Sequence, residues 1–92
     1  SESTEINAVS TPQSGDIIID IRHPAEREAA PLTQISNRCL LIPFFDLLPQ
    51  LANLDPNQKY LLYCKQGIMG KLQVHAMRKQ GFKNVAVLNL DD

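Results

Sequence analysis

The run Asp-Ile-Ile-Ile-Asp-Ile at residues 16–21 constrains the fold of this chain more than any other segment. It is β-branched and bounded by Gly15 and Pro24, which favours a short strand. Because its apolar residues are consecutive rather than alternating with polar ones, both faces of this strand need covering. Strands of this kind belong to parallel sheets with structure packed on each side.

Apolar runs and helical patterns alternate along the rest of the chain. Strands are predicted at residues 39–42, 59–64 and 84–88, with a short edge strand within 5–9. Helices are predicted at residues 24–30, 44–54 and 69–80, the last burying Met69, Leu72, Ala76 and Met77. Pro49 fits either the first turn of a helix starting near Leu48 or a break between two short helices. The pattern predicts an α/β fold: a central, mostly parallel sheet of four or five strands with helices on both faces.

Length and composition place the chain among small globular domains. Its 92 residues suffice for one core, and 43% apolar with 21% charged residues is an ordinary globular balance. No apolar run approaches the ~18 residues that a membrane span needs. The chain begins Ser-Glu-Ser-Thr without an apolar signal segment, so we expect a piece of a longer protein that works in the cytoplasm.

The metal-binding residue types are sparse and scattered. Cys39 and Cys64 lie too far apart for a zinc knuckle and do not form a disulfide framework. His23 and His75 have no partner at ligand spacing. The sequence therefore predicts neither a metal site nor a cofactor.

Cys64 is the strongest candidate for chemistry. The strand before it ends at this residue, and a short loop with Gly67 and Gly70 leads into the next helix. Ligands of parallel sheets bind beyond the carboxyl ends of the strands, and the N–H groups and dipole of a helix N-terminus favour a thiolate. Both glycines are expected to provide positive φ or close backbone approach. The alternative is that Cys64 is only a buried strand end and Gly67 an ordinary turn residue.

Charge is unevenly distributed in a chain whose net charge is −1. Residues 59–90 contain no acid and six basic residues: Lys59, Lys65, Lys71, Arg78, Lys79 and Lys83. The last three are expected on the solvated face of a helix. Lys65 and Lys71 flank the cysteine loop, where their field would stabilise a thiolate and attract an anionic substrate or partner. The pattern does not indicate a nucleic-acid platform.

Several motifs together resemble one known family. The segment Asp20-Ile21-Arg22, Glu26 shortly after it, and a cysteine opening a loop are similar to the rhodanese-like domain family over nearly the whole chain. More narrowly, the chain resembles the C-terminal rhodanese-like domain of bacterial tRNA 4-thiouridine sulfurtransferases, which are also linked to thiamine thiazole synthesis. The segments that carry this narrower resemblance include Pro43-Phe44, Leu61-Leu62-Tyr63-Cys64, Gly67-Ile68-Met69 and Gln80-Gly81-Phe82-Lys83-Asn84-Val85.

The resemblance implies a sulfurtransferase in which residues 1–92 are a single rhodanese-like domain, the C-terminal part of a larger protein. Cys64 would accept sulfane sulfur from a cysteine desulfurase as a persulfide, and pass it to a uridine adenylated by another domain of the tRNA-binding parent protein. Asp20, Arg22 and Glu26 would form an ion-paired brace beneath the loop. The outer sulfur would be cradled by the backbone N–H groups of Lys65, Gln66, Gly67, Ile68 and Met69.

The end of the cysteine loop departs from the wider family, and this departure limits the alternatives. Many rhodaneses carry an arginine or serine late in the loop, and loop-cysteine phosphatases need an arginine there, whereas this chain has Met69 and Gly70. Thiosulfate binding and phosphatase activity are therefore disfavoured, and a protein-docking module without chemistry stays open. Cys39 is expected to be inert packing. We accordingly expect Cys64 to be alkylated well below the ordinary thiol pKa of about 8.5, and Cys39 only after unfolding.

Overall fold

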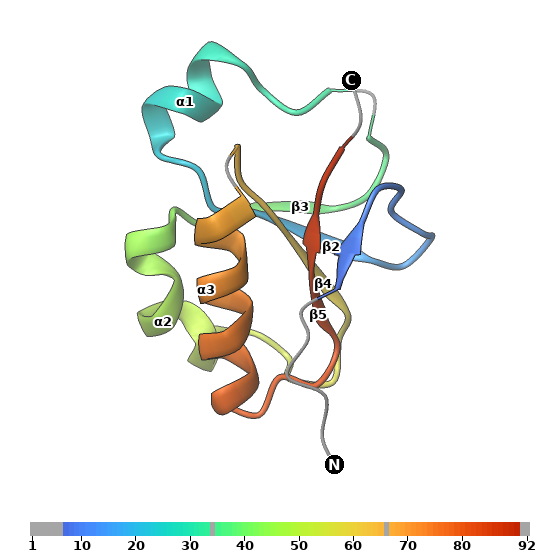
Figure 1. Cartoon of the computed structure of the whole chain (residues 1–92), viewed down its shortest axis with the longest axis vertical. Coiled ribbons are helices and arrows are strands. Elements are labelled where there is room, and N and C mark those ends of the chain that lie inside the picture. Colours follow the sequence, from blue (N-terminus) through green and yellow to red (C-terminus); the bar gives the residue numbers. More distant parts are fainter. Residues whose placement is uncertain (1–6, 34, 66, 91–92) are drawn as a thin grey trace.

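The computed structural model describes residues 7–33, 35–65 and 67–90, which form five strands and several helices (Figure 1). The strands are β1 (Ala8–Val9), β2 (Ile17–Asp20), β3 (Cys39–Leu41), β4 (Tyr60–Tyr63) and β5 (Val85–Leu88). The helices are α1 (Pro24–Ala29), α2 (Leu47–Gln50) and α3 (Gly67–Lys79), with 3-10 turns η1 (Phe44–Asp46) and η2 (Leu51–Asn53) around α2. Four of the predicted strands are present within one residue at each end. The edge strand predicted within 5–9 is the two-residue β1, and Glu5 and Ile6 lie outside the described residues.

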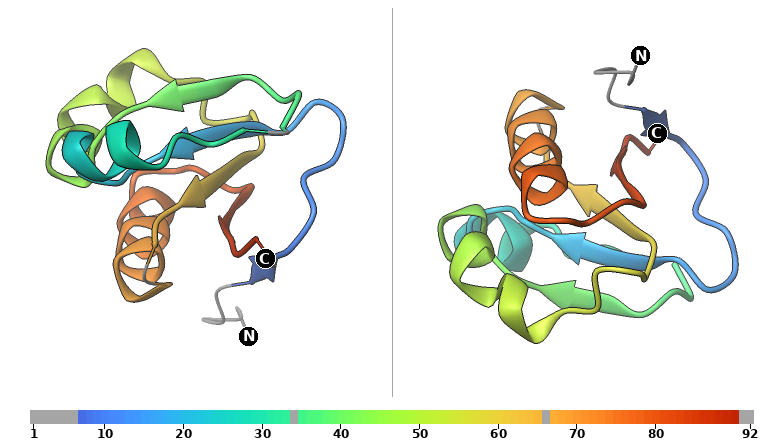
Figure 2. Two further views of the ribbon diagram at one scale, coloured as in Figure 1. Left: turned by 90° about the horizontal axis from the view of Figure 1, so that it is seen from above. Right: turned by 90° about the horizontal axis from the view of Figure 1, so that it is seen from below.

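The five strands form one parallel sheet in the order β1-β5-β4-β2-β3, seen from both ends in Figure 2. Asp20 pairs with Leu41 on one side and with Tyr63 on the other, and Tyr63 pairs with Leu88. The carboxyl ends of four strands are therefore level. The α/β parallel fold is confirmed, and the short N-terminal strand lies at the sheet edge as expected.

Consecutive isoleucines in β2 serve the two faces of the sheet. Ile19 belongs to the cluster that packs against α2 and α3 through Leu47, Val74 and Met77. Ile18 belongs to a second cluster on the opposite face with Leu61, Ala86 and Leu88, against which Val9, Leu32, Ile35 and Leu90 pack. Full burial of each such side chain contributes roughly 1.5–3 kcal/mol. Loop segments thus cover much of the second face, and α1 itself has no buried residue.

The buried face of α3 differs from the prediction. Gly70, Val74 and Met77 are buried, whereas Leu72 is 58% exposed. Two residues along an α-helix correspond to a rotation of about 200° around the helix axis. Because Gly70 packs against the sheet, Leu72 therefore faces the solvent. The prediction that Leu72 belongs to the core is wrong, because the close approach at Gly70 sets the rotation of this helix.

The two short helical segments follow their proline signals. Pro24 is the first residue of α1, whose N-cap His23 accepts a hydrogen bond at Nδ1 from the N–H of Ala25 at 3.1 Å. In the second segment, Pro49 lies in the first turn of α2. The N–H groups of a first turn have no carbonyl partner within the helix, so the missing N–H of proline costs no hydrogen bond there. The first of the two alternatives for Pro49 is therefore correct, with 3-10 turns on both sides of a single α-helical turn.

Candidate active site

Cys64 follows the last residue of β4, and its side chain lies against Gly70, at the end of the first turn of α3. A Cβ atom built on Gly70 would be 3.3 Å from the Cys64 Sγ and 3.3 Å from both Val87 methyl groups. The thiol therefore sits in the junction between strand and helix. Because α3 begins at Gly67, the N–H groups of its first turn have no carbonyl partner within the helix, and they lie on its positive end.

Two cavities meet at this cysteine. One of about 230 Å³ is lined by Ile21, Arg22, Glu26, Phe44, Cys64, Lys65 and Met69. Another of about 540 Å³ on the α1 side is lined by Arg22, Glu26, Ala29, Ala30, Tyr63, Cys64, Lys65, Asn89 and Leu90. Cys64 is half-buried, with one side on the core and the other on these cavities. A thiol placed in this way can be reached by another reactant.

The structure brings together only part of the predicted site. Lys65 and Met69 line the cavities with Cys64, while Gly67 and Ile68 occupy the exposed first turn of α3. Gln66 lies outside the described residues. The sequence reasoning did not assign Phe44, Tyr63 or Asn89 to the site. Each lies at or just after the carboxyl end of a strand, which is the signal that would have identified all three.

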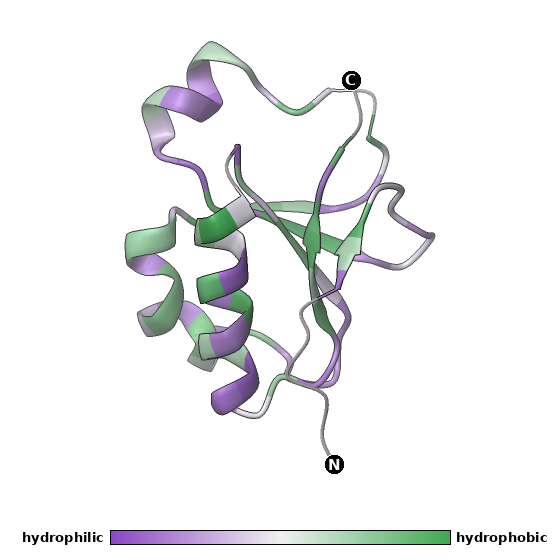
Figure 3. Cartoon of the chain, in the orientation of Figure 1, coloured by the Kyte–Doolittle hydropathy of each residue, from purple (hydrophilic) through white to green (hydrophobic). Residues whose placement is uncertain are grey.

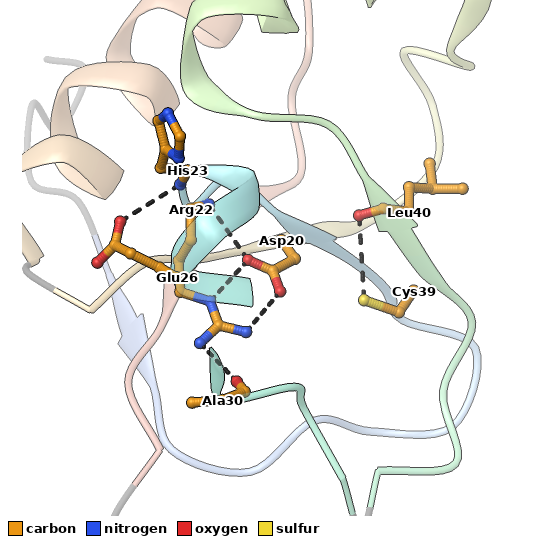
Figure 4. A network of polar contacts seen from close by, with 7 residues as sticks. All are labelled: Asp20, Arg22, His23, Glu26, Ala30, Cys39 and Leu40. Atoms are coloured by element: carbon orange, nitrogen blue, oxygen red, sulfur yellow. Dashed lines mark hydrogen bonds and ion pairs between the residues drawn. The ribbon is translucent and has the colours of Figure 1, made fainter. Parts of the chain in front are cut away.

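A buried ion pair stands beneath the loop, as the resemblance implies. Arg22 donates from Nε and Nη2 to the Asp20 carboxylate at 2.9 and 2.8 Å, and from Nη1 to the Ala30 carbonyl at 2.8 Å (Figure 4). The two side chains are 5% and 1% exposed. The hydrogen bonds to Asp20 raise the pKa of Arg22 above its ordinary value. The guanidinium also lies over the Tyr63 ring at 4.9 Å, which connects β2 to the end of β4.

Glu26 caps helix α1 instead of joining the expected ion-paired brace. Its carboxylate accepts a hydrogen bond from the His23 N–H at 3.3 Å and completes the capping box of α1 (Figure 4). Within the described residues, the ion pair of Arg22 is with Asp20 and not with Glu26. The three-residue brace is thus a buried pair plus a helix cap, because the turn of α1 directs Glu26 to its own N-terminus.

The two loop glycines are not equivalent. Gly70 is required for close approach, as the contacts to Cys64 and Val87 indicate. Nothing lies within 4 Å of a Cβ built on Gly67, and the residues with positive φ in the described chain are Gly15 and Gly81. The expectation for Gly67 is therefore wrong, since α3 already begins there with ordinary helical geometry.

This difference predicts that an alanine substitution will affect stability at Gly70 but hardly at Gly67. Gly67→Ala is expected to leave the urea midpoint nearly unchanged, because the new methyl group meets open space. Gly70→Ala is expected to be less stable than Gly67→Ala by about 1 kcal/mol and to slow alkylation of Cys64, because the methyl group crowds a filled site. Urea unfolding and iodoacetamide kinetics measure both effects. Equal midpoints and equal alkylation rates in the two variants would contradict the assignment of Gly70.

Cys39 lies on the second face of the sheet and is half-buried rather than sealed. It packs against the second core cluster and lines a cavity of about 540 Å³ with Asp20, Pro24, Arg27, Glu28, Pro31, Leu32 and Leu41. Burial raises the pKa of the Cys39 thiol above its ordinary value, and the nearby Asp20 carboxylate adds to the shift. In the folded protein, its low reactivity should therefore come from the scarcity of thiolate as well as from partial burial.

We expect alkylation of Cys39 in the native protein to stay slow at neutral pH and to accelerate only above pH ~8.5, where ordinary thiols ionise. The same shift lowers stability at high pH: the unfolded thiol loses its proton first, so the free energy of unfolding falls as pH rises through that range. Peptide mapping after iodoacetamide treatment between pH 6 and pH 10 (roughly spanning the ordinary thiol pKa) measures each cysteine separately. Fast labelling of Cys39 at neutral pH would show that the shift is absent.

Neither a metal-binding cluster nor a membrane-spanning helix is found in the described parts of the chain. No three His, Cys, Asp or Glu side chains among them are grouped so that they could hold a metal ion. None of the helices in these parts is both long and apolar enough to cross a membrane.

Comparisons with known proteins agree with this architecture. The family model for the rhodanese-like domain matches residues 6–90. A tRNA sulfurtransferase from Marinobacter nauticus is 42% identical over 83 residues, and one from Shewanella frigidimarina is 46% identical over 84 residues. These alignments cover 90% and 91% of this chain but 17% of each relative, so the chain spans less than a fifth of their length.

A solved structure with low sequence identity has the same fold. The NAD-dependent persulfide reductase from A. fulgidus superposes with a TM-score of 0.71 at 18% identity, covering 92% of this chain and 14% of that one. With the parallel sheet, the cysteine at the end of β4 and the buried Asp20–Arg22 pair, the match over residues 6–90 identifies the family. The chain belongs to the rhodanese-like domain family.

Proposed function

We propose that this domain is a sulfur carrier in which Cys64 takes up sulfane sulfur as a persulfide and passes it on. The observation that supports this most is the position of Cys64, which faces two cavities at the carboxyl end of β4 and touches the beginning of α3. The family to which the chain belongs, and relatives named tRNA sulfurtransferase, agree with that chemistry.

The proposed uptake step exchanges one thiolate for another. The Cys64 thiolate attacks the outer sulfur of a persulfide on the donor protein, forming a new S–S bond as the donor's S–S bond breaks. The donor cysteine leaves as a thiolate, and Cys64 then carries the terminal sulfur with its charge or proton. No external oxidant or reductant is needed, because the sulfane sulfur moves between two sulfur atoms of equal oxidation state.

The terminal sulfur would be held by backbone N–H groups rather than by a charged side chain. In this proposal the N–H groups of Lys65, Gly67, Ile68 and Met69 would donate to it, and the positive end of α3 would stabilise its charge. Gln66, the other residue expected in the cradle, lies outside the described residues. Met69 lines the cavity where a phosphatase would need an arginine. Arg22 also lines it, but its guanidinium is hydrogen-bonded to Asp20 and Ala30. The site therefore suits a single sulfur better than an oxyanion.

The proposed setting is a larger cytoplasmic enzyme. The relatives are more than five times longer than the matched segment and are named tRNA sulfurtransferase, which supports a longer parent protein that acts on tRNA. Its other domains would bind the tRNA and adenylate the uridine. We propose a cysteine desulfurase as the sulfur donor. The final products would be 4-thiouridine in tRNA and the thiazole of thiamine. This domain itself would only carry sulfur on Cys64. It would not provide a nucleic-acid platform, so the tRNA would be bound by other parts of the parent protein.

The test is to incubate the reduced domain with a cysteine desulfurase and cysteine, then map its peptides by mass spectrometry. The expected result is the mass of one added sulfur on the peptide containing Cys64, removed by a thiol reductant. An unmodified Cys64 peptide, under conditions in which the desulfurase itself carries a persulfide, would favour the alternative of a docking module without chemistry.

A further inference from the structure

Exposed apolar side chains lie on the two helical segments that contribute Phe44 and Met69 to the Cys64 cavity. Among the described residues, five large hydrophobic side chains are at least half exposed, and four of them lie on the η1–α2 segment and on α3. We call these four the apolar rim: Phe45, Leu48, Ile68 and Leu72, which are 54%, 50%, 73% and 58% exposed. Figure 3 shows hydrophobic segments on the first turns of α3 and on the neighbouring α2. Single exposed leucines are ordinary on a protein surface, but four such side chains on two neighbouring segments are a candidate contact surface.

The apolar rim is continuous with the cavity that contains the thiol. Phe45 packs edge-on against Phe44 with ring centroids 5.3 Å apart, and Phe44 lines the 230 Å³ cavity with Cys64. On the other side, Ile68 directly precedes Met69, which lines the same cavity. A molecule that reaches Cys64 through this mouth would therefore meet Phe45 and Ile68 first. Leu48 and Leu72 lie about one helical turn further along the same two segments, and Leu48 also lines a separate cavity with Gln80 and Phe82.

The charges around the rim are separated. The α3 side carries the exposed Lys65 and Lys71, and residues 59–90 contain no acidic residue. Glu26 and Asp46 stand on the opposite side of the mouth, on α1 and η1. A complementary surface would place apolar residues over the rim and acidic groups over the beginning of α3.

We propose that the apolar rim is the docking surface for the protein that delivers sulfur to Cys64, with an apolar contact face and acidic groups on the α3 side. This rests on the proposed carrier function. Persulfide transfer requires the two sulfur atoms to come within bonding distance, and Cys64 is half-buried. The donor must therefore insert its cysteine into the mouth, and its surface around that cysteine then lies on the rim.

Three identical substitutions test this inference. Leu72→Glu and Leu48→Glu each place a charge in the rim. Leu41→Glu is the matched control, because Leu41 is 56% exposed and lines the cavity with Cys39 on the other face of the sheet. Each variant is loaded from two sources: a cysteine desulfurase with cysteine, and inorganic polysulfide, a small donor that needs no docking. Reductant-labile sulfur on Cys64 is followed with time.

We expect loading by the desulfurase to slow about tenfold or more in Leu72→Glu and Leu48→Glu, and to stay within about twofold of the wild-type rate in Leu41→Glu. Polysulfide should load all four proteins at similar rates, which also shows that the variants are folded.

Equal desulfurase rates in wild type and both rim variants would overturn the docking surface alone. A wild-type dimer that Leu72→Glu dissociates, with desulfurase loading unchanged, would assign the rim to a second copy and also overturn it. If neither donor loads the wild type, the carrier function fails, and the docking surface with it.

Discussion

Cys64→Ser is expected to reduce sulfur loading of this domain to background, whereas Cys39→Ser should load like the wild type. A serine hydroxyl is not ionised at neutral pH and cannot form the S–S bond on which carriage depends. The fold should be retained, because serine replaces a half-buried side chain of nearly the same size. The measurement uses ³⁵S-cysteine with a cysteine desulfurase and non-reducing electrophoresis.

The two single variants make this experiment selective. Both proteins keep one thiol, so unselective transfer of sulfane sulfur from polysulfide formed in the mixture would label both of them. Label that persists on Cys64→Ser and disappears from Cys39→Ser would move the carrier role to the cavity that Cys39 lines on the opposite face of the sheet. That result would contradict the proposed function of the loop between β4 and α3.

Arg22→Met is expected to cause the largest loss of stability of any substitution near the site. It removes the partner of Asp20, whose carboxylate is 1% exposed and would then be a buried charge without its guanidinium. Breaking a buried pair in this way costs roughly 3–5 kcal/mol, against a total stability of about 5–15 kcal/mol for a small domain. The free energy of unfolding, measured with urea, gives the effect.

The control is Arg38→Met, because the Arg38 side chain is exposed and its loss should change stability by no more than about 0.5 kcal/mol. A double variant, Asp20→Asn with Arg22→Met, should recover part of the loss, since the buried charge is removed as well. If the Arg22 and Arg38 variants unfold at the same urea concentration, the pair does not stabilise the loop as described. Arg22→Met should also slow alkylation of Cys64, because Arg22 lines both cavities that Cys64 lines.

The strand pattern could be predicted because it depends on local chemistry. The isoleucines of β2 are β-branched and are bounded by Gly15 and Pro24, and the strands they pair with have similar boundaries. Placement of Cys64 followed from the same pattern, since the carboxyl ends of parallel strands share one edge of the sheet. The register of Asp20 with Tyr63 then brings Arg22 beside Cys64.

The helical details could not be obtained in this way. Leu72 fits an apolar stripe as well as Val74 does, and only the seating of Gly70 on Val87 decides between them. Glu26 could pair with Arg22 or cap its own helix, and the direction of α1 selects the cap. Both outcomes depend on how elements far apart in sequence approach each other.

The sequence alone therefore determined the order of the elements, the parallel sheet and the edge at which its thiol lies, because β-branched runs, prolines and strand polarity act locally. Only the tertiary structure decided which side of α3 is buried, which carboxylate neutralises Arg22, and that Cys64 opens to cavities bordered by exposed apolar residues. These features result from the packing of α3 and α2 on the sheet, where contacts between distant residues outweigh the preferences of each segment.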